Sequence, residues 1–150
     1  MYKTILVAID DSETSAKALR EAIAIAGACG IGLHITHAVD ESLFPTHYRG
    51  GALLVDPAAA QRALEDEGRV VLDRAAATAR AAGIEATTHL VSSETRHTAD
   101  QILQAAADTG ADLVIVGSHG RRGVERLLLG SVAERVARKA GVSVLIVRGD

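Results

Sequence analysis

Glycine and serine residues with a fixed spacing are the part of this sequence best suited to chemistry. The segment GSHGRRGVERLLLGS, residues 117–131, places Gly117, Gly120, Gly130 and Ser131 in the pattern Gly-x2-Gly-x9-Gly-Ser. Glycines permit left-handed backbone angles and a close approach of N–H groups to an oxyanion. An apolar run precedes the segment and a helix-like run follows it, so we expect phosphate to bind where this loop meets a helix N-terminus.

The other polar residues of the segment add less. No Gly-Lys-Ser/Thr sequence occurs, so the segment is not a Walker A loop. Arg121, Arg122 and Arg126 could neutralise phosphate, although arginines in a polar loop are more often solvated. His119 could contact phosphate, and nothing in the sequence indicates that it acts as a base.

Elements that would position the segment can be read from hydropathy. Apolar runs without clean alternation are typical of parallel strands buried on both faces; they cover Thr4–Ile9, Gly32–Val39, Ile84–Val91, Leu113–Val116 and Val142–Val147. The connection at residues 42–56 is long and carries paired glycines, which predicts a mobile surface loop.

Helix signals separate these runs. The first helix is predicted to begin at Asp11 or Ser12 and to end near Cys29, and the second to begin with Asp56 as N-cap. Capping boxes starting at Thr98 and Ser131 predict the third and fourth helices. Left-handed glycines are expected to close all four helices.

The predicted order βαβαβαβαβ implies an α/β fold. We expect a five-stranded parallel, Rossmann-like sheet with helices on both faces and one domain over residues 1–150. Strand orders 3-2-1-4-5 and 2-1-3-4-5 are both compatible with the pattern, and we choose the first. That order opens a crevice between strands 1 and 4, where ligands bind in such sheets. Asp10 and the glycine segment then lie on its two lips.

Composition excludes several classes of function. The chain of 150 residues has a net charge of −3 and 2% aromatic residues, which argues against nucleic-acid binding. No apolar run is long enough to span a membrane. Cys29 is the one cysteine, so no internal disulfide forms. A single, buried thiol fits a reducing compartment, and we expect a cytoplasmic protein.

Three segments together resemble the universal stress protein family, in its ATP-binding branch. They read ILVAIDDSETSAKAL, HAVDE and DLVIVGSHGRRGVERLLLGSVAERVARKAGVSVLIVR. The resemblance covers nearly the whole chain and is weak between residues 42 and 95. It implies strand order 3-2-1-4-5. Ser143 stands where the family often has proline, which affects the start of the last strand but not the phosphate site.

The resemblance also implies a site for ATP, with Mg²⁺ held mainly by the phosphates. Gly117, Gly120, Gly130 and Ser131 would hold ribose and phosphates, Asp10 the ribose or adenine side, and Ala38 the adenine pocket. The complete set of predicted site residues is Ala8, Ile9, Asp10, Ala38, Val116, Gly117, Gly120, Arg121, Gly130, Ser131 and Val132.

The family's role implies a stress-response regulatory module that acts through nucleotide-dependent conformation or through an unknown protein partner. The alternative is a slow ATPase or phosphoryl-transfer enzyme, which would need a residue to position the attacking water. A receiver-like phospho-acceptor domain is disfavoured, because Ser92-Ser93 and Arg148 stand where aspartate and lysine are needed.

A homodimer is expected through the last strand. Its residues Val144, Leu145, Ile146 and Val147 are apolar, whereas the other predicted edge strand is polar. An apolar edge with free backbone groups favours pairing with another strand, and a second copy can supply it about a two-fold axis. The resemblance implies dimers of the same kind.

Overall fold

The expected five-stranded sheet is present, with every strand parallel to its neighbours. The computed structural model describes residues 1–40, 48–49, 52–53, 56–93, 95–120 and 129–149. The sheet has the order β5-β2-β1-β6-β7. Counted along the sheet's own strands, this is the predicted 3-2-1-4-5. Its strands are β1 (Thr4–Ala8), β2 (Gly32–Ala38), β5 (Ala86–Val91), β6 (Leu113–Gly117) and β7 (Ser143–Val147).

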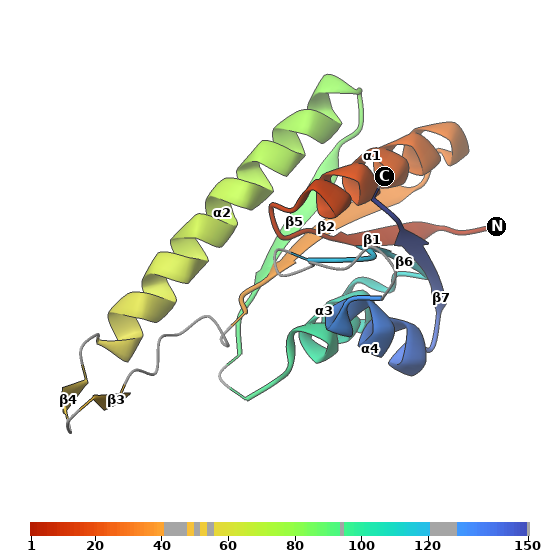
Figure 1. Cartoon of the computed structure of the whole chain (residues 1–150). Helices are drawn as coiled ribbons and strands as arrows, with labels where there is room; N and C mark the ends of the chain where they lie inside the picture. The colour runs from red at the N-terminus through yellow and green to blue at the C-terminus, as the bar shows by residue number, and fades with distance from the viewer. Residues whose placement is uncertain (41–47, 50–51, 54–55, 94, 121–128, 150) are drawn as a thin grey trace.

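Helices cover both faces of the sheet (Figure 1). Alternation along each strand divides the apolar side chains between two cores. On β1, Ile5 and Val7 join a core with α1 and α2, whereas Leu6 joins a core with α3 and α4. The helices are α1 (Glu13–Cys29), α2 (Pro57–Ala81), α3 (Thr98–Thr109) and α4 (Ser131–Lys139). This double coverage explains why the strands read as continuous apolar runs.

The first two helices begin as predicted, and the last two begin one residue differently. Ser12 caps α1 through Ser15 N, and Asp56 caps α2 through Ala58 N. His97 caps α3 through Ala99 N, so the predicted cap at Thr98 is wrong. Ser131 is likewise the first helical residue of α4 rather than its N-cap. Both capping-box assignments fail because the preceding residue, His97 or Gly130, takes the non-helical backbone of the N-cap.

Three of the four helices end at a glycine with a left-handed backbone, as predicted, and the fourth does not. Gly30, Gly83 and Gly110 have positive φ angles of 63°, 78° and 66°. The predicted left-handed position at Gly141 is wrong, because α4 ends at Lys139 and Ala140 is already extended. Cys29 is exposed, not buried as expected, since it is the last residue of α1 and the chain turns at Gly30.

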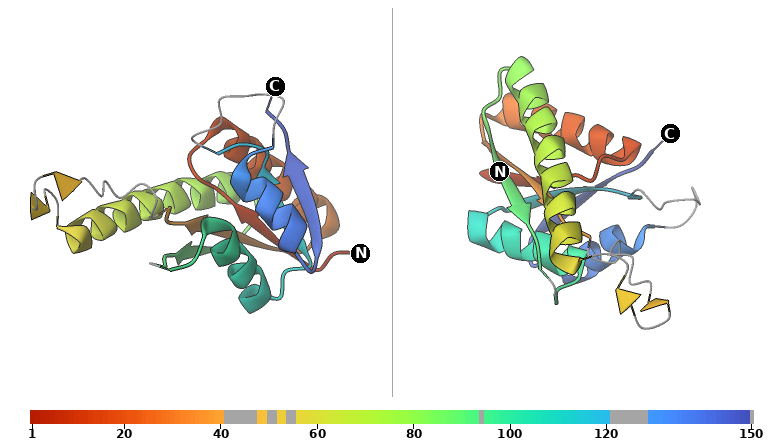
Figure 2. Two further views of the ribbon diagram at one scale, coloured as in Figure 1. Left: turned by 60° about the horizontal axis from the view of Figure 1, so that its bottom comes forward. Right: turned by 90° about the vertical axis from the view of Figure 1, so that its left-hand side faces the viewer.

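The long connection contains an antiparallel pair that the sequence did not predict. Strands β3 (Tyr48–Arg49) and β4 (Ala52–Leu53) pair with each other and lie beyond the N-terminal end of α2, which extends past the sheet (Figures 1 and 2). The predicted mobile loop at residues 42–56 otherwise falls largely outside the described residues. No helix in the described ranges is long and apolar enough to cross a membrane.

Candidate functional site

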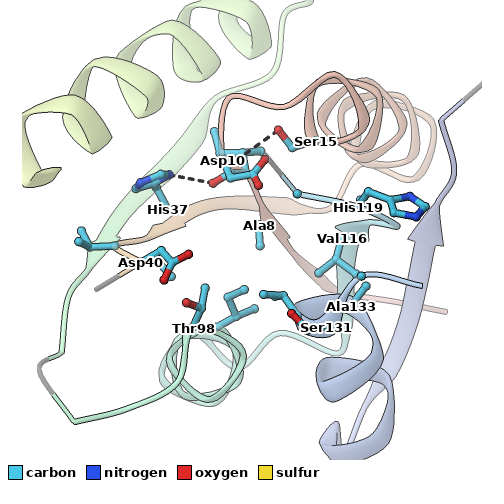
Figure 3. Close-up of a pocket in the computed structure, with 18 of the residues that line it drawn as sticks. Ala8, Asp10, Ser15, His37, Asp40, Thr98, Val116, His119, Ser131 and Ala133 are labelled. Carbon is cyan, nitrogen blue, oxygen red and sulfur yellow. Dashed lines mark hydrogen bonds between the residues drawn. The ribbon is translucent and has the colours of Figure 1, made fainter. Parts of the chain in front are cut away.

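A cavity of about 430 Å³ lies at the carboxyl edge of the sheet, where the strand order reverses (Figure 3). Such a volume falls within the range of small-molecule sites. Every predicted site residue that the structure describes lines it: Ala8, Ile9, Asp10, Ala38, Val116, Gly117, Gly120, Gly130, Ser131 and Val132. Arg121 lies outside the described residues. The crevice between β1 and β6 therefore brings together the acidic and glycine-rich segments, as the sheet order requires.

Asp10 is fixed at the β1 side of the cavity. Its Oδ1 atom accepts a hydrogen bond from Ser12 N at 3.1 Å, and its own N–H donates to Ser15 Oγ at 3.3 Å. The next residue, Asp11, has a φ of 63°, an angle that few residues other than glycine adopt. Asp11 pairs with Arg74 of α2 at 3.3 Å, outside the cavity. The turn therefore assigns Asp10 to the cavity and Asp11 to the surface.

The glycines of the motif are present for space, not for left-handed angles. A Cβ atom on Gly117 would lie 2.8 Å from Thr14 Oγ1, and one on Gly130 would lie 3.0 Å from Ser118 O. One on Gly120 would lie 2.6 Å from Asp10 Oδ2. None of these glycines has a positive φ, so of the two properties that glycine offers, close approach is the one used here. Gly117 packs closely against Thr14 of α1, and Gly130 packs closely against the backbone of Ser118.

The N-terminus of α4 opens into this cavity without a side-chain cap. Gly130 occupies the N-cap position with φ −62° and ψ 149°, and it has no side chain that could cap the first turn. Gly130 N donates to Ser118 O at 2.7 Å, which holds the helix start against β6. The first backbone N–H groups of a helix have no partner inside it, and they carry the positive end of the helix dipole. This end of the cavity therefore favours an anion.

His37 forms part of the opposite wall. It is buried, and its Nδ1 atom is 2.9 Å from Ile9 O, so the ring ties the end of β2 to the end of β1 (Figure 3). Since a carbonyl oxygen only accepts, Nδ1 carries the hydrogen. α2 packs on this ring at Gly68, where an added Cβ would lie 2.7 Å from His37 Cδ2. His37 thus fixes both the crevice and the helix that overhangs it.

Several lining residues were not predicted. Asp40 follows β2, Leu64 and Glu67 come from α2, and Arg96 and Thr98 flank the start of α3. The residues at the start of α3 could have been predicted from the topology, because a helix that follows a parallel strand begins at the carboxyl edge of the sheet. His119 lines the cavity, yet its ring turns toward β7 and its Nδ1 lies 2.9 Å from Ser118 Oγ (Figure 3). A contact of this ring with phosphate, raised from the sequence, gains no support.

Asp100 joins the first turn of α3 to the second half of α4. Its Oδ1 accepts from Lys139 Nζ at 2.8 Å and its Oδ2 from Arg135 at 3.0 Å. The hydrogen bond from Lys139, with that from Arg135, lowers the pKa of the Asp100 carboxyl. Because both cations belong to α4, the ion pairs fix the two helices that carry the lining residues Thr98 and Ser131 relative to each other.

Comparison with known proteins agrees with this architecture. The model of the Universal stress protein family matches residues 1–148. The chain belongs to the universal stress protein family. Universal stress protein YxiE of Bacillus subtilis is 34% identical over 151 residues, with 99% of this chain and all of that protein covered.

Solved structures of universal stress proteins share the fold. A family member from Burkholderia pseudomallei aligns with a TM-score of 0.77 at 34% identity, covering 97% of this chain and 96% of the other. A universal stress protein in complex with cAMP aligns with a TM-score of 0.69 at 30% identity, covering 97% of both chains. The second of these relatives binds an adenine nucleotide.

Proposed function

We propose that this universal stress protein binds an adenine nucleotide, ATP, in the cavity at the carboxyl edge of its sheet. One observation carries the proposal: the uncapped N-terminus of α4 faces the same cavity as the carboxylate of Asp10. A helix N-terminus favours phosphate, and a carboxylate accepts hydrogen bonds from sugar hydroxyls. The relative that binds cAMP supports an adenine nucleotide as the ligand class.

The three parts of the nucleotide have distinct places. Phosphates lie on the first turn of α4, with the Ser131 hydroxyl available because it is not spent on a cap. Ribose lies beside Asp10, on the cavity side of its contact with Gly120. Arg121, which the sequence also assigned to the site, lies outside the described residues.

Adenine lies at Ala38. Ile9 N donates to Thr36 O at 2.9 Å, whereas Val39 N donates to Val91 O at 2.8 Å. Because backbone groups alternate between neighbouring strands, those of Ala38 face the β1 side, from which the chain has already departed at Asp10. An adjacent N–H and C=O match the N1 acceptor and the amino donor of adenine.

Mg²⁺ accompanies ATP through the phosphates. In the described part of the chain, no group of three or more His, Cys, Asp or Glu side chains could hold a metal ion. A cation bound mostly by phosphate oxygens and water needs no such group. The bound nucleotide acts on conformation or on the choice of a protein partner, in a stress response.

The chain acts as a homodimer joined along β7. This strand is one edge of the sheet, and its residues Val144, Leu145 and Ile146 are only partly buried. Ser118 N donates to Val147 O at 2.7 Å, so the backbone of Val147 faces β6. By alternation, Val144 and Ile146 direct their N–H and C=O groups outward, where a second β7 would pair with them.

Mass analysis of small molecules extracted from the purified protein tests the ligand. We expect an adenine nucleotide near one per chain, or its uptake when ATP is added to a stripped sample. A stripped protein that takes up no adenine nucleotide would contradict the proposal.

A further inference from the structure

Hydrogen-bond acceptors gather at the end of the cavity remote from α4. Asp40, the second residue past the end of β2, lines the cavity, as does Glu67 of α2. Figure 3 draws the Asp40 carboxylate directed into the cavity on the side of Ala8 and Thr98, across from Val116 and Ala133. The phosphate end is therefore favourable to anions, whereas the Asp40 carboxylate favours a hydrogen-bond donor at the far end.

A buried amide supports the wall of the cavity behind this end. Gln101 is 4% exposed, and its Nε2 donates to Arg96 O at 3.0 Å and to Val39 O at 3.5 Å. These two carbonyl partners fix which way the amide points. Gln101 Oε1 is then a buried acceptor with no partner within the described ranges. Gln101 does not line the cavity, so its amide supports the wall at Val39 and Arg96 and does not itself meet a ligand.

We infer that Asp40 determines which base the cavity takes, by accepting a hydrogen bond from an exocyclic amino group. This inference rests on the proposed function, because it places adenine at Ala38. The amino group of adenine has two hydrogens, and the Ala38 carbonyl takes one of them. The Asp40 carboxylate takes the other. A 6-oxo purine presents an oxygen at this position, and an oxygen facing a carboxylate is left unpaired.

The probes are ATP and its 6-oxo analogue ITP, titrated calorimetrically into wild-type protein and Asp40→Asn. Wild type should prefer ATP. In the variant, ATP affinity should fall about tenfold, because a hydrogen bond to a charged acceptor commonly contributes that much. ITP affinity should stay the same or rise, because an Asn amide can donate to the 6-oxo group. A purely structural role would weaken both nucleotides together.

Two further variants serve as controls for the assignment to Asp40. Asp73→Asn removes the same charge from an exposed position of α2 outside the cavity, and the ATP to ITP ratio should not change. Glu67→Gln should also keep the wild-type ratio. A normal ratio in Asp40→Asn, or a loss of preference in Glu67→Gln alone, would overturn the assignment to Asp40. A wild type that binds neither nucleotide would overturn the proposed function and this inference together.

Discussion

Gly120 and Asp10 lie so close that a Cβ atom on the glycine would be 2.6 Å from Asp10 Oδ2. The contact joins the ends of β1 and β6 across the crevice. Asp10 cannot swing away freely, because its Oδ1 atom is bonded to Ser12 N. The position of the carboxylate and the absence of a side chain at residue 120 are therefore linked.

Gly120→Ala should weaken ATP binding without unfolding the protein. The methyl group displaces the Asp10 carboxylate from the ribose, and the loss of a charge-assisted hydrogen bond costs about tenfold in affinity. Gly141→Ala is the matched control, because nothing lies within 4 Å of its added Cβ. Calorimetry and thermal unfolding measure both properties. Equal ATP affinities in the two variants would show that Asp10 does not contribute to nucleotide binding.

Alanine substitution of Gly27 in α1 and of Gly68 in α2 should change the stability of the protein in opposite directions. Gly68→Ala forces a methyl group to within 2.7 Å of His37 Cδ2 and Leu90 Cδ1, whereas Gly27→Ala meets only Ile84 Cδ1 at 3.4 Å. Alanine favours a helix over glycine by about 1 kcal/mol, and overpacking costs about 1–3 kcal/mol. We expect Gly27→Ala to raise the free energy of unfolding and Gly68→Ala to lower it by about 1 kcal/mol. Urea denaturation measures the free energy of unfolding of both variants. An increase in both would mean that α2 does not pack tightly against His37.

Val144→Pro should convert the proposed dimer to a monomer. Proline removes an N–H that points outward from β7 and leaves the bonds to β6 intact. Val144→Ala is the control, since it trims the side chain but keeps the N–H. Sedimentation at high micromolar concentration should show a monomer for the proline variant and a dimer for wild type and the alanine variant. A monomeric wild type, with and without ATP, would exclude the dimer.

His34 should make folding stability depend on pH. Burial, and then the charge of His89, lowers the pKa of His34 below its usual 6.5; the two rings meet at 2.8 Å, His34 Nδ1 to His89 Nε2. The unfolded chain therefore binds more protons, so this contribution is present above about pH 6.5 and is lost as the pH falls below it. His34→Gln should flatten the decline in unfolding free energy between about pH 7 and pH 5. An unchanged slope would contradict this prediction.

Much of the fold was readable from the sequence because each element has a strong local signal. The apolar runs gave the strands, and Asp56-Pro57 gave a helix start. Periodicity alone left two strand orders open; the family resemblance selected the correct one. Helix starts at Thr98 and Ser131 were placed wrongly because several residues near a boundary can cap. The fit of Thr14 against Gly117 could not be foreseen, since it depends on how α1 packs against the loop.

Some residues of the candidate site could likewise be predicted from the sequence, and others could not. Residues of the motif and Asp10 follow strand ends, so topology alone brings them together. Asp40 and Glu67 carry no spacing signal, and only the three-dimensional structure shows that they line the same cavity.

The most direct test of the account is a calorimetric titration of ATP, with Mg²⁺, into the stripped wild-type protein. We expect saturable binding of one nucleotide per chain, and about tenfold weaker binding in Gly120→Ala than in Gly141→Ala. Absence of binding heat and of ATP-dependent thermal stabilisation in wild type at millimolar nucleotide would contradict the claim that this cavity is an adenine nucleotide site.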